Sequence, residues 1–315
     1  MSDADQKSYH KLTLHPPRVY RNLGIVITLE PSYEALKEAS LVAVEPLWPK
    51  YPRTRRLWDL LMNDAEAQAN WDMADHMAVV KLGYNDHGQT HAVNAATNAL
   101  RIFDLLVNAG LEPDVVASGA GDLDDACMTV AVATLLHDIG NQVHRKYHEM
   151  MGLGLARDML DRLMPEVYPD VERRVQLRAF ILHAILAHDF DPPPLTFEAG
   201  VVAVADGTDV TKGRGRKAFD LGKVDTLRDS VSALAIDEVR IGPGEHYPVE
   251  ITVLMNNSAG IFQIEDTLTK KVVKGPLAKW ITVTAMTSPS DSATDARIIE
   301  KLTLKNGVFV AEQNV

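Results

Sequence analysis

Residues 135–140 read Leu-Leu-His-Asp-Ile-Gly and close an apolar run that begins near Ala126. The run predicts a helix that is apolar almost all round, which is typical of a buried helix. Its end places His137 beside Asp138, and a buried aspartate is costly unless it pairs with a cation. Imidazole and carboxylate groups together suit divalent transition metals. This stretch therefore predicts a metal site at the end of a buried helix.

Length and composition are those of an ordinary globular protein. The chain has 315 residues, of which 46% are hydrophobic and 24% charged. A net charge of −11 argues against general binding to nucleic acid or to an anionic membrane. The single cysteine, Cys127, excludes an internal disulfide, and we find neither a signal-peptide pattern nor an apolar run long enough to span a membrane. We therefore expect a cytoplasmic protein.

The first two thirds of the chain predict helices. Residues 1–24 are polar and are expected to form an arm, and Ile25 begins a short apolar segment that could be a strand. Helical spacing of apolar residues then predicts helices from Ser32 onwards and over 54–69, 91–108, 122–137, 144–164, 171–189 and 197–211.

The last third changes character. Alternating apolar residues predict strands over 249–255 and 280–286, with an amphipathic stretch over 261–273 between them. Asn306-Gly307 predicts a hairpin turn. We expect a mainly α protein with an all-helical core and a smaller C-terminal α+β domain, divided as residues 1–84, 85–222 and 223–315.

The histidines and aspartates recur in an order that resembles the HD-domain superfamily, whose pattern is a histidine, a later His-Asp pair and a final aspartate. Here these are His91, His137-Asp138 and Asp206. The run 136–140 is similar to the signature of the HD-GYP branch, as is His148 with a glycine four residues later.

Three departures from that branch are visible in the sequence. His183 and His188 are five residues apart instead of adjacent, and Asn141 stands where the branch has a lysine. The Gly-Tyr-Pro motif is absent, with Asp-Pro-Pro-Pro at 191–194 in that region. These departures argue against cyclic-di-GMP hydrolysis and leave metal binding as the expectation.

The resemblance implies a metal centre with Asp138 bridging two divalent ions. Its ligands would be His91, His137, Asp138, His148, His183 and Asp206. Iron or manganese suits these donors best, with zinc, nickel and magnesium as alternatives. His144 lies four residues before His148 on the same helix face, so either could be the ligand, and the glycine spacing favours His148. A site for one metal, held only by the His-Asp pair and Asp206, is the simpler alternative.

Further residues are candidates for catalysis and substrate binding. We expect catalytic roles for Asp138, His144 and His188, with a third metal or a phosphate as the partner of His188 and a solvated helix end as the alternative. Basic side chains expected to bind substrate phosphate are Arg145, Lys212, Arg214, Arg216 and Lys217. A solvated loop is the alternative for this basic cluster.

The resemblance implies a metal-dependent phosphohydrolase, a phosphomonoesterase or phosphodiesterase, that acts on a nucleotide or another small phosphate ester. A mixed-valent di-iron oxygenase is the first alternative, because such members of the superfamily use the same complement of four histidines and two aspartates. A non-enzymatic ligand-sensing module is the second, with residues 223–315 binding a partner or forming a homodimer. We expect no membrane partner and no general binding to nucleic acid.

Overall fold

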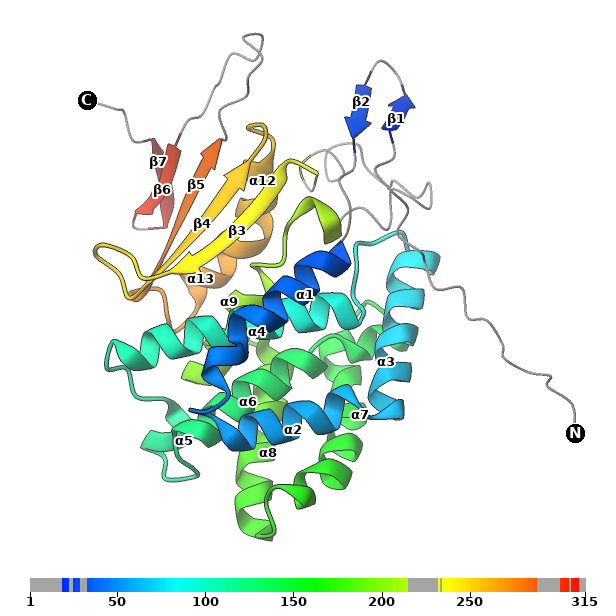
Figure 1. The fold of residues 1–315 in the computed structure, drawn as a ribbon, viewed down its shortest axis with the longest axis vertical. Helices are drawn as coiled ribbons and strands as arrows, with labels where there is room; N and C mark the ends of the chain where they lie inside the picture. The colour runs from blue at the N-terminus through cyan, green and yellow to red at the C-terminus, as the bar shows by residue number, and fades with distance from the viewer. Residues whose placement is uncertain are drawn as a thin grey trace, which may run out of the picture.

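The protein is described by a computed structural model, which covers residues 19–22, 25–28, 33–214, 232, 234–287, 301–305 and 307–311. A body of helices carries a sheet on one side, and the sheet is formed by the C-terminal third of the chain (Figure 1). The expected mainly α fold with a smaller C-terminal α+β part is confirmed. None of the described helices is long and apolar enough to cross a membrane.

The helical body is built around α6 (Leu123–Leu136), on which every residue after Leu123 is buried. Asp122 caps its start in a capping box with Asp125, so the helix begins where the apolar run does. The surrounding helices are α1 (Tyr33–Val44), α2 (Pro52–Met62), α3 (Ala65–Asp75), α4 (Gln89–Asn108), α5 (Asp114–Ala117), α7 (His148–Leu163), α8 (Val171–Ala187) and α9 (Phe197–Asp206). Short helical turns η1 (Glu45–Leu47), η2 (His76–Lys81), η3 (Ile139–Gln142) and η4 (Met164–Glu166) join some of them.

Several segments differ from the sequence prediction. Helix α7 begins at His148 instead of residue 144, and α9 ends at Asp206 instead of residue 211. The single helix expected over 54–69 is two helices, because Asp64 accepts a hydrogen bond from the Ala67 N–H and starts α3. Part of the expected polar arm forms β1 (Val19–Asn22), which pairs antiparallel with β2 (Ile25–Thr28), the short strand that the sequence allowed.

The sheet has the strand order β3-β4-β5-β6-β7. Its strands are β3 (Ile236–Gly242), β4 (Val249–Met255), β5 (Ile281–Thr287), β6 (Lys301–Lys305) and β7 (Val308–Ala311). The β4–β5 pair is parallel and the other neighbours are antiparallel. Strand β3 was not predicted from the sequence, whereas the hairpin of β6 and β7 was.

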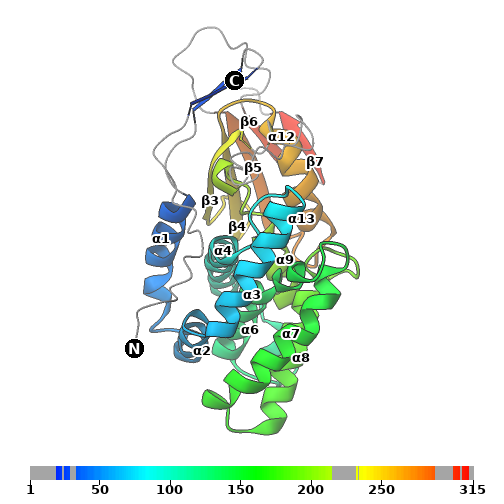
Figure 2. The same cartoon turned by 90° about the vertical axis from the view of Figure 1, so that its right-hand side faces the viewer.

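The crossover between β4 and β5 attaches the sheet to the helices. It consists of α12 (Gly260–Ile264), the π-helical turn η5 (Glu265–Thr269) and α13 (Lys270–Lys274). Figure 2 shows α13 beside α9, with which it is in contact. A Cβ atom at Gly200 of α9 would lie 2.7 Å from the Pro276 side chain, so glycine permits this close approach. The crossover also contacts the C-terminal end of α9, where Lys271 pairs with Asp206.

Candidate metal centre

Four buried histidines and two buried aspartates converge at the ends of five helices. His91 is in the first turn of α4, and Asp206 is the last residue of α9. The others stand at the end of α6, the start of α7 and the end of α8; they are His137, Asp138, His148 and His188. Among the described residues, three overlapping triads drawn from these six place their ligand atoms close enough to hold a metal ion.

Asp138 lies at the centre of this cluster and divides its two oxygens between two pairs of histidines. Its Oδ2 is 3.3 Å from His91 Nε2 and 3.2 Å from His137 Nε2. Its Oδ1 is 3.2 Å from His148 Nε2 and 3.9 Å from His188 Nε2. A carboxylate that faces two sets of nitrogen donors is placed to bridge two cations.

Asp206 adds a second carboxylate to one of these sets. Its Oδ1 lies 3.1 Å from His91 Nε2 and 3.5 Å from His137 Nε2. One set of donors therefore consists of His91, His137 and Asp206 with one oxygen of Asp138. The other consists of His148 and His188 with the remaining oxygen of Asp138.

The opposite ring nitrogen of each histidine is held by another group. His91 Nδ1 donates to Asp209 Oδ2 at 2.7 Å. The other Nδ1 atoms lie near main-chain oxygens: His137 at 2.7 Å from Thr134 O, His188 at 2.7 Å from Ile185 O, and His148 at 3.1 Å from Arg145 O. Because Nδ1 is held in this way, Nε2 is the nitrogen that faces the cluster, which is how histidine ligands of metals are oriented in proteins.

The charges of the cluster also fit a bound cation. Burial and Arg214 lower the pKa of His91, but hydrogen bonds to Asp138, Asp206 and Asp209 outweigh them and raise it to about 10. Burial likewise lowers the pKa of His137, yet the charge of Asp138 raises it to about 9. The carboxylates are thus ionised, and protons on imidazole balance them. A divalent cation can take the place of those protons. The nitrogen donors, the carboxylates and the negative charge of the cluster without its imidazole protons therefore all fit a metal ion.

A glycine brings the start of α7 to the cluster. A Cβ atom at Gly140 would lie 1.9 Å from the carbonyl oxygen of His148 and 2.5 Å from the amide nitrogen of Gly152. Any larger residue would push α7, and with it His148, away from Asp138. The glycine of the 135–140 stretch therefore has a packing role that the sequence did not reveal.

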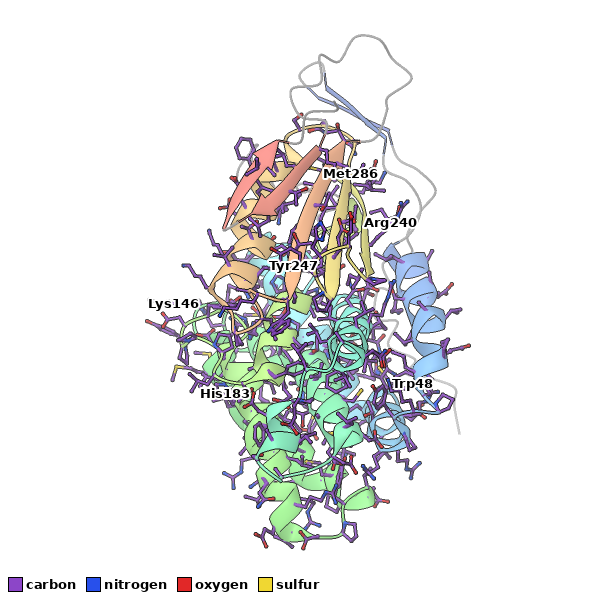
Figure 3. The ribbon with its side chains drawn as sticks, turned by 90° about the vertical axis from the view of Figure 1, so that its left-hand side faces the viewer. Trp48, Lys146, His183, Arg240, Tyr247 and Met286 are labelled. Carbon is purple, nitrogen blue, oxygen red and sulfur yellow. The ribbon has the colours of Figure 1, made fainter. Side chains whose placement is uncertain are left out.

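Two predicted site residues are not brought to the cluster. His183 is half-buried, and its Nε2 accepts a hydrogen bond from the Leu195 N–H at 3.0 Å. Figure 3 shows it on the helical part of the molecule. His188, for which we expected a catalytic role, instead lies within the cluster. His144 is exposed, and its Nδ1 accepts a hydrogen bond from the Lys146 N–H at 2.9 Å.

The predicted phosphate-binding residues have different surroundings. Arg145 stands beside the cluster, with its Nη1 3.8 Å from Asp138 Oδ1. Arg214 is buried and also lies beside the cluster, with its Nη2 3.1 Å from His91 Nε2. It donates from Nε to the Asp86 carbonyl at 3.0 Å and from Nη1 to the Asp209 carbonyl at 3.1 Å. Lys212 pairs with Asp237 of β3 at 3.0 Å. Arg216 and Lys217 lie outside the described residues.

Sequence reasoning missed two residues at the cluster. Asp209, which orients His91, follows Asp206 by three residues, and a helical turn of that length was a usable signal. Lys271 of α13 is buried and pairs with Asp206 Oδ2. Nothing in its segment distinguishes Lys271 from its neighbour Lys270.

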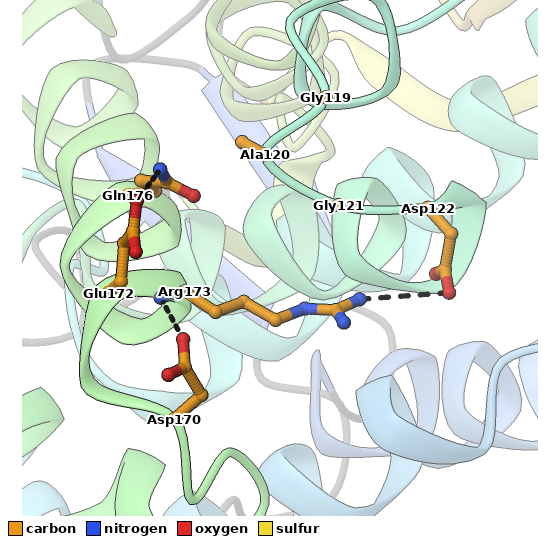
Figure 4. A pocket seen from close by; sticks show the side chains of 8 residues that line it. All are labelled: Gly119, Ala120, Gly121, Asp122, Asp170, Glu172, Arg173 and Gln176. Carbon is orange, nitrogen blue, oxygen red and sulfur yellow. Dashed lines mark hydrogen bonds and ion pairs between the residues drawn. The ribbon is translucent and has the colours of Figure 1, made fainter.

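A separate surface pocket lies at the other end of α8. It is lined by Gly119, Ala120, Gly121, Asp122, Asp170, Glu172, Arg173 and Gln176 (Figure 4). Arg173, its basic residue, is paired with Asp122 and Asp125. Gln176, the lining residue nearest to His188 in sequence, precedes it by 12 residues, so about 18 Å of helix separates them. It is therefore distinct from the histidine cluster.

Known proteins give one family match and one curated relative. Residues 90–211 match the family model described as HD domain. Uncharacterized protein MJ1020 of Methanocaldococcus jannaschii is 38% identical over 236 residues, which is 73% of this chain and 88% of that relative. No solved structure matches the chain significantly.

Proposed function

Because the chain belongs to the HD-domain superfamily, we propose that it is a metal-dependent phosphohydrolase acting on a nucleotide or another phosphate ester. One observation carries the proposal: the two oxygens of Asp138 face separate pairs of histidine Nε2 atoms. That arrangement supports a centre for two metal ions more than a centre for one.

The two ions would share Asp138. One would be held by His91, His137 and Asp206, and the other by His148 and His188. Nitrogen and oxygen donors without thiolate favour iron or manganese over a structural zinc, and Cys127 is buried in α6 away from these ligand groups. When bound, such a pair supplies an activated water nucleophile and neutralises charge on the phosphate oxygens.

Arg145 is the residue that we propose to bind the substrate phosphate. Its guanidinium lies 3.8 Å from Asp138 Oδ1 and 3.8 Å from Asp189 Oδ2, and its side chain keeps 31% of its surface exposed. It can therefore reach a ligand at the centre, and its planar fork matches phosphate oxygens. Arg214 is instead proposed to fix the loop of Asp86 and the segment of Asp209. Arg216 and Lys217 stay candidates on the sequence alone.

The test is hydrolysis by the full chain loaded with Mn²⁺ or Fe²⁺, on a panel of phosphomonoesters, phosphodiesters and nucleotides. Release of phosphate or of the alcohol product should be lost in Asp138→Asn, which keeps the side-chain shape. Asp158→Asn, an exposed site on α7, is the matched control and should keep full activity. A metal-loaded protein that leaves the whole panel intact would overturn the proposal.

A di-iron oxygenase is the second candidate, because the cluster retains four histidines and two aspartates with His188 included. The two candidates differ in redox chemistry. An EPR signal from a half-reduced di-iron pair, together with two irons per chain, would favour the oxygenase. Two zinc or two manganese ions in the active protein would count against it.

A further inference from the structure

A side chain of the C-terminal part of the chain contacts the candidate metal centre. This residue, Lys271 of α13, is only 8% exposed. Its Nζ pairs with Asp206 Oδ2 and lies 3.3 Å from Asp189 Oδ1. A buried ammonium group that touches two carboxylates needs both for its stability, because an unpaired buried charge is costly.

The packing of α13 fixes where Lys271 enters. A Cβ atom at Gly207 would lie 3.3 Å from Lys271 Cδ and 3.2 Å from Leu268 Cα. A Cβ atom at Gly275 would lie 2.8 Å from the Lys271 carbonyl oxygen and 3.3 Å from the Phe190 ring. Glycines thus bring α13 against the end of α9 and against the segment after α8. The π-helical turn η5 directly precedes α13, and such turns are frequent at functional sites.

Lys271 leaves Asp206 with one oxygen for a metal. Oδ1 faces His91 and His137, whereas Oδ2 is held by the ammonium group. A carboxylate in this state can bind a metal through one oxygen and has its orientation fixed by the other. The same ammonium group ties Asp206 to Asp189, whose Oδ2 lies 3.8 Å from His148 Nε2.

We propose that Lys271 is a positioning residue of the metal centre, which holds Asp206 as a one-oxygen ligand and joins it to Asp189. The C-terminal α+β part therefore completes the site instead of being an independent appendage. This inference rests on the metal centre of the proposed function. Groups that hold a metal ligand in place typically contribute 10–100-fold to metal affinity.

The proposal is tested by measuring the affinity of the full chain for Mn²⁺, with the EPR signal of free Mn²⁺ as the readout. Lys271→Met should weaken binding about tenfold or more. Lys271→Arg, which keeps the charge and the donors, should restore most of the affinity. Lys270→Met is the matched control, because Lys270 is its neighbour on α13 but is exposed and pairs with Asp266; its affinity should equal that of the wild type.

Lys271→Met that binds Mn²⁺ as tightly as the wild type, or more tightly, would overturn the inference, since removal of a nearby positive charge alone would strengthen binding. Circular dichroism checks that each variant is folded. If the methionine variant does not fold, Lys271→Gln is used in its place, because its amide can still donate to Asp206. We expect Lys271→Gln to lose Mn²⁺ affinity, but less than Lys271→Met would. If the wild type binds no metal, the proposed function is overturned as well. If the wild type binds two ions and the Lys271 variants bind them with the same affinity, this inference alone is overturned.

Discussion

Replacing His188 by alanine should remove one of two metal ions. His188 is 1% exposed, and its Nε2 lies 3.1 Å from His148 Nε2. Without it, that half of the centre retains His148 and one oxygen of Asp138. The loss of a group that only orients a ligand already costs 10–100-fold in metal affinity, so the loss of a ligand should cost about 100-fold or more. The other half keeps His91, and its ion should stay.

His183→Ala is the matched control, because His183 is on the same helix five residues earlier. It would lose the hydrogen bond from the Leu195 N–H, which is worth about 1 kcal/mol of folding stability. Its metal content should not change. The assay is metal per chain by mass spectrometry after loading with Mn²⁺ and dialysis, with thermal unfolding as the check of stability.

We expect two ions per chain in the wild type and in His183→Ala, and one in His188→Ala. The opposite result, with the metal lost from His183→Ala and kept by His188→Ala, would refute the assignment of His188 as a ligand.

Four further predictions rest on pKa shifts and packing. The metal must displace protons from His91 and His137, whose pKa values are about 10 and 9. Mn²⁺ affinity should therefore rise between pH 7 and pH 9, by up to about 100-fold per pH unit if two protons are released. An affinity that does not change with pH would contradict this. The same raised values stabilise the metal-free fold below the ordinary histidine pKa, and this stability should be lost as pH rises towards 10 in urea unfolding. Burial raises the pKa of Glu198 from 4.5 to about 7. The free energy of unfolding of the wild type should therefore fall by about 3 kcal/mol between pH 4.5 and pH 8 through this group. In Glu198→Gln, the free energy of unfolding measured in urea should change less over that range. Gly140→Ala should lower the melting temperature and cost about 1–3 kcal/mol or more through overpacking, while Gly154→Ala on α7, where a Cβ meets open space, should be neutral or stabilising.

Much of the fold could be predicted because its signals are local. The apolar run of α6 follows directly on its N-terminal cap, β4 alternates over seven residues, and Ile281, Val283 and Ala285 of β5 alternate with threonines. Strand β3 was missed because its burial alternates irregularly and its first register with β4 contains a bulge. The break between α2 and α3 was missed because an aspartate cap outweighs a continuous apolar pattern.

The choice between His183 and His188 depended on which face of α8 looks inward. Leu177, Ile181 and Ala184 are buried at helical spacing, and His188 continues that row four residues after Ala184. His183 lies off the row. The signal was thus present in the sequence, although the resemblance to a family with adjacent histidines pointed to His183.

Lys271 and Arg214 could not be assigned from sequence, because their roles arise from contacts between distant segments. Lys271 meets Asp206 across 65 positions, and Arg214 donates to the Asp86 carbonyl across 128. Both were indistinguishable from surface cations in composition. The basic residues after Asp206 were therefore interpreted as one phosphate-binding group, whereas Lys212 turns to β3 and Arg214 is buried.

The number of metal ions bound per chain tests the central claim most directly. Mass spectrometry of the purified full-length protein, without added metal, should find two ions of iron or manganese per chain, and Asp138→Asn should lose both because its bridge is gone. A folded wild type that holds no stoichiometric metal, before or after loading, would contradict a metal centre built on Asp138.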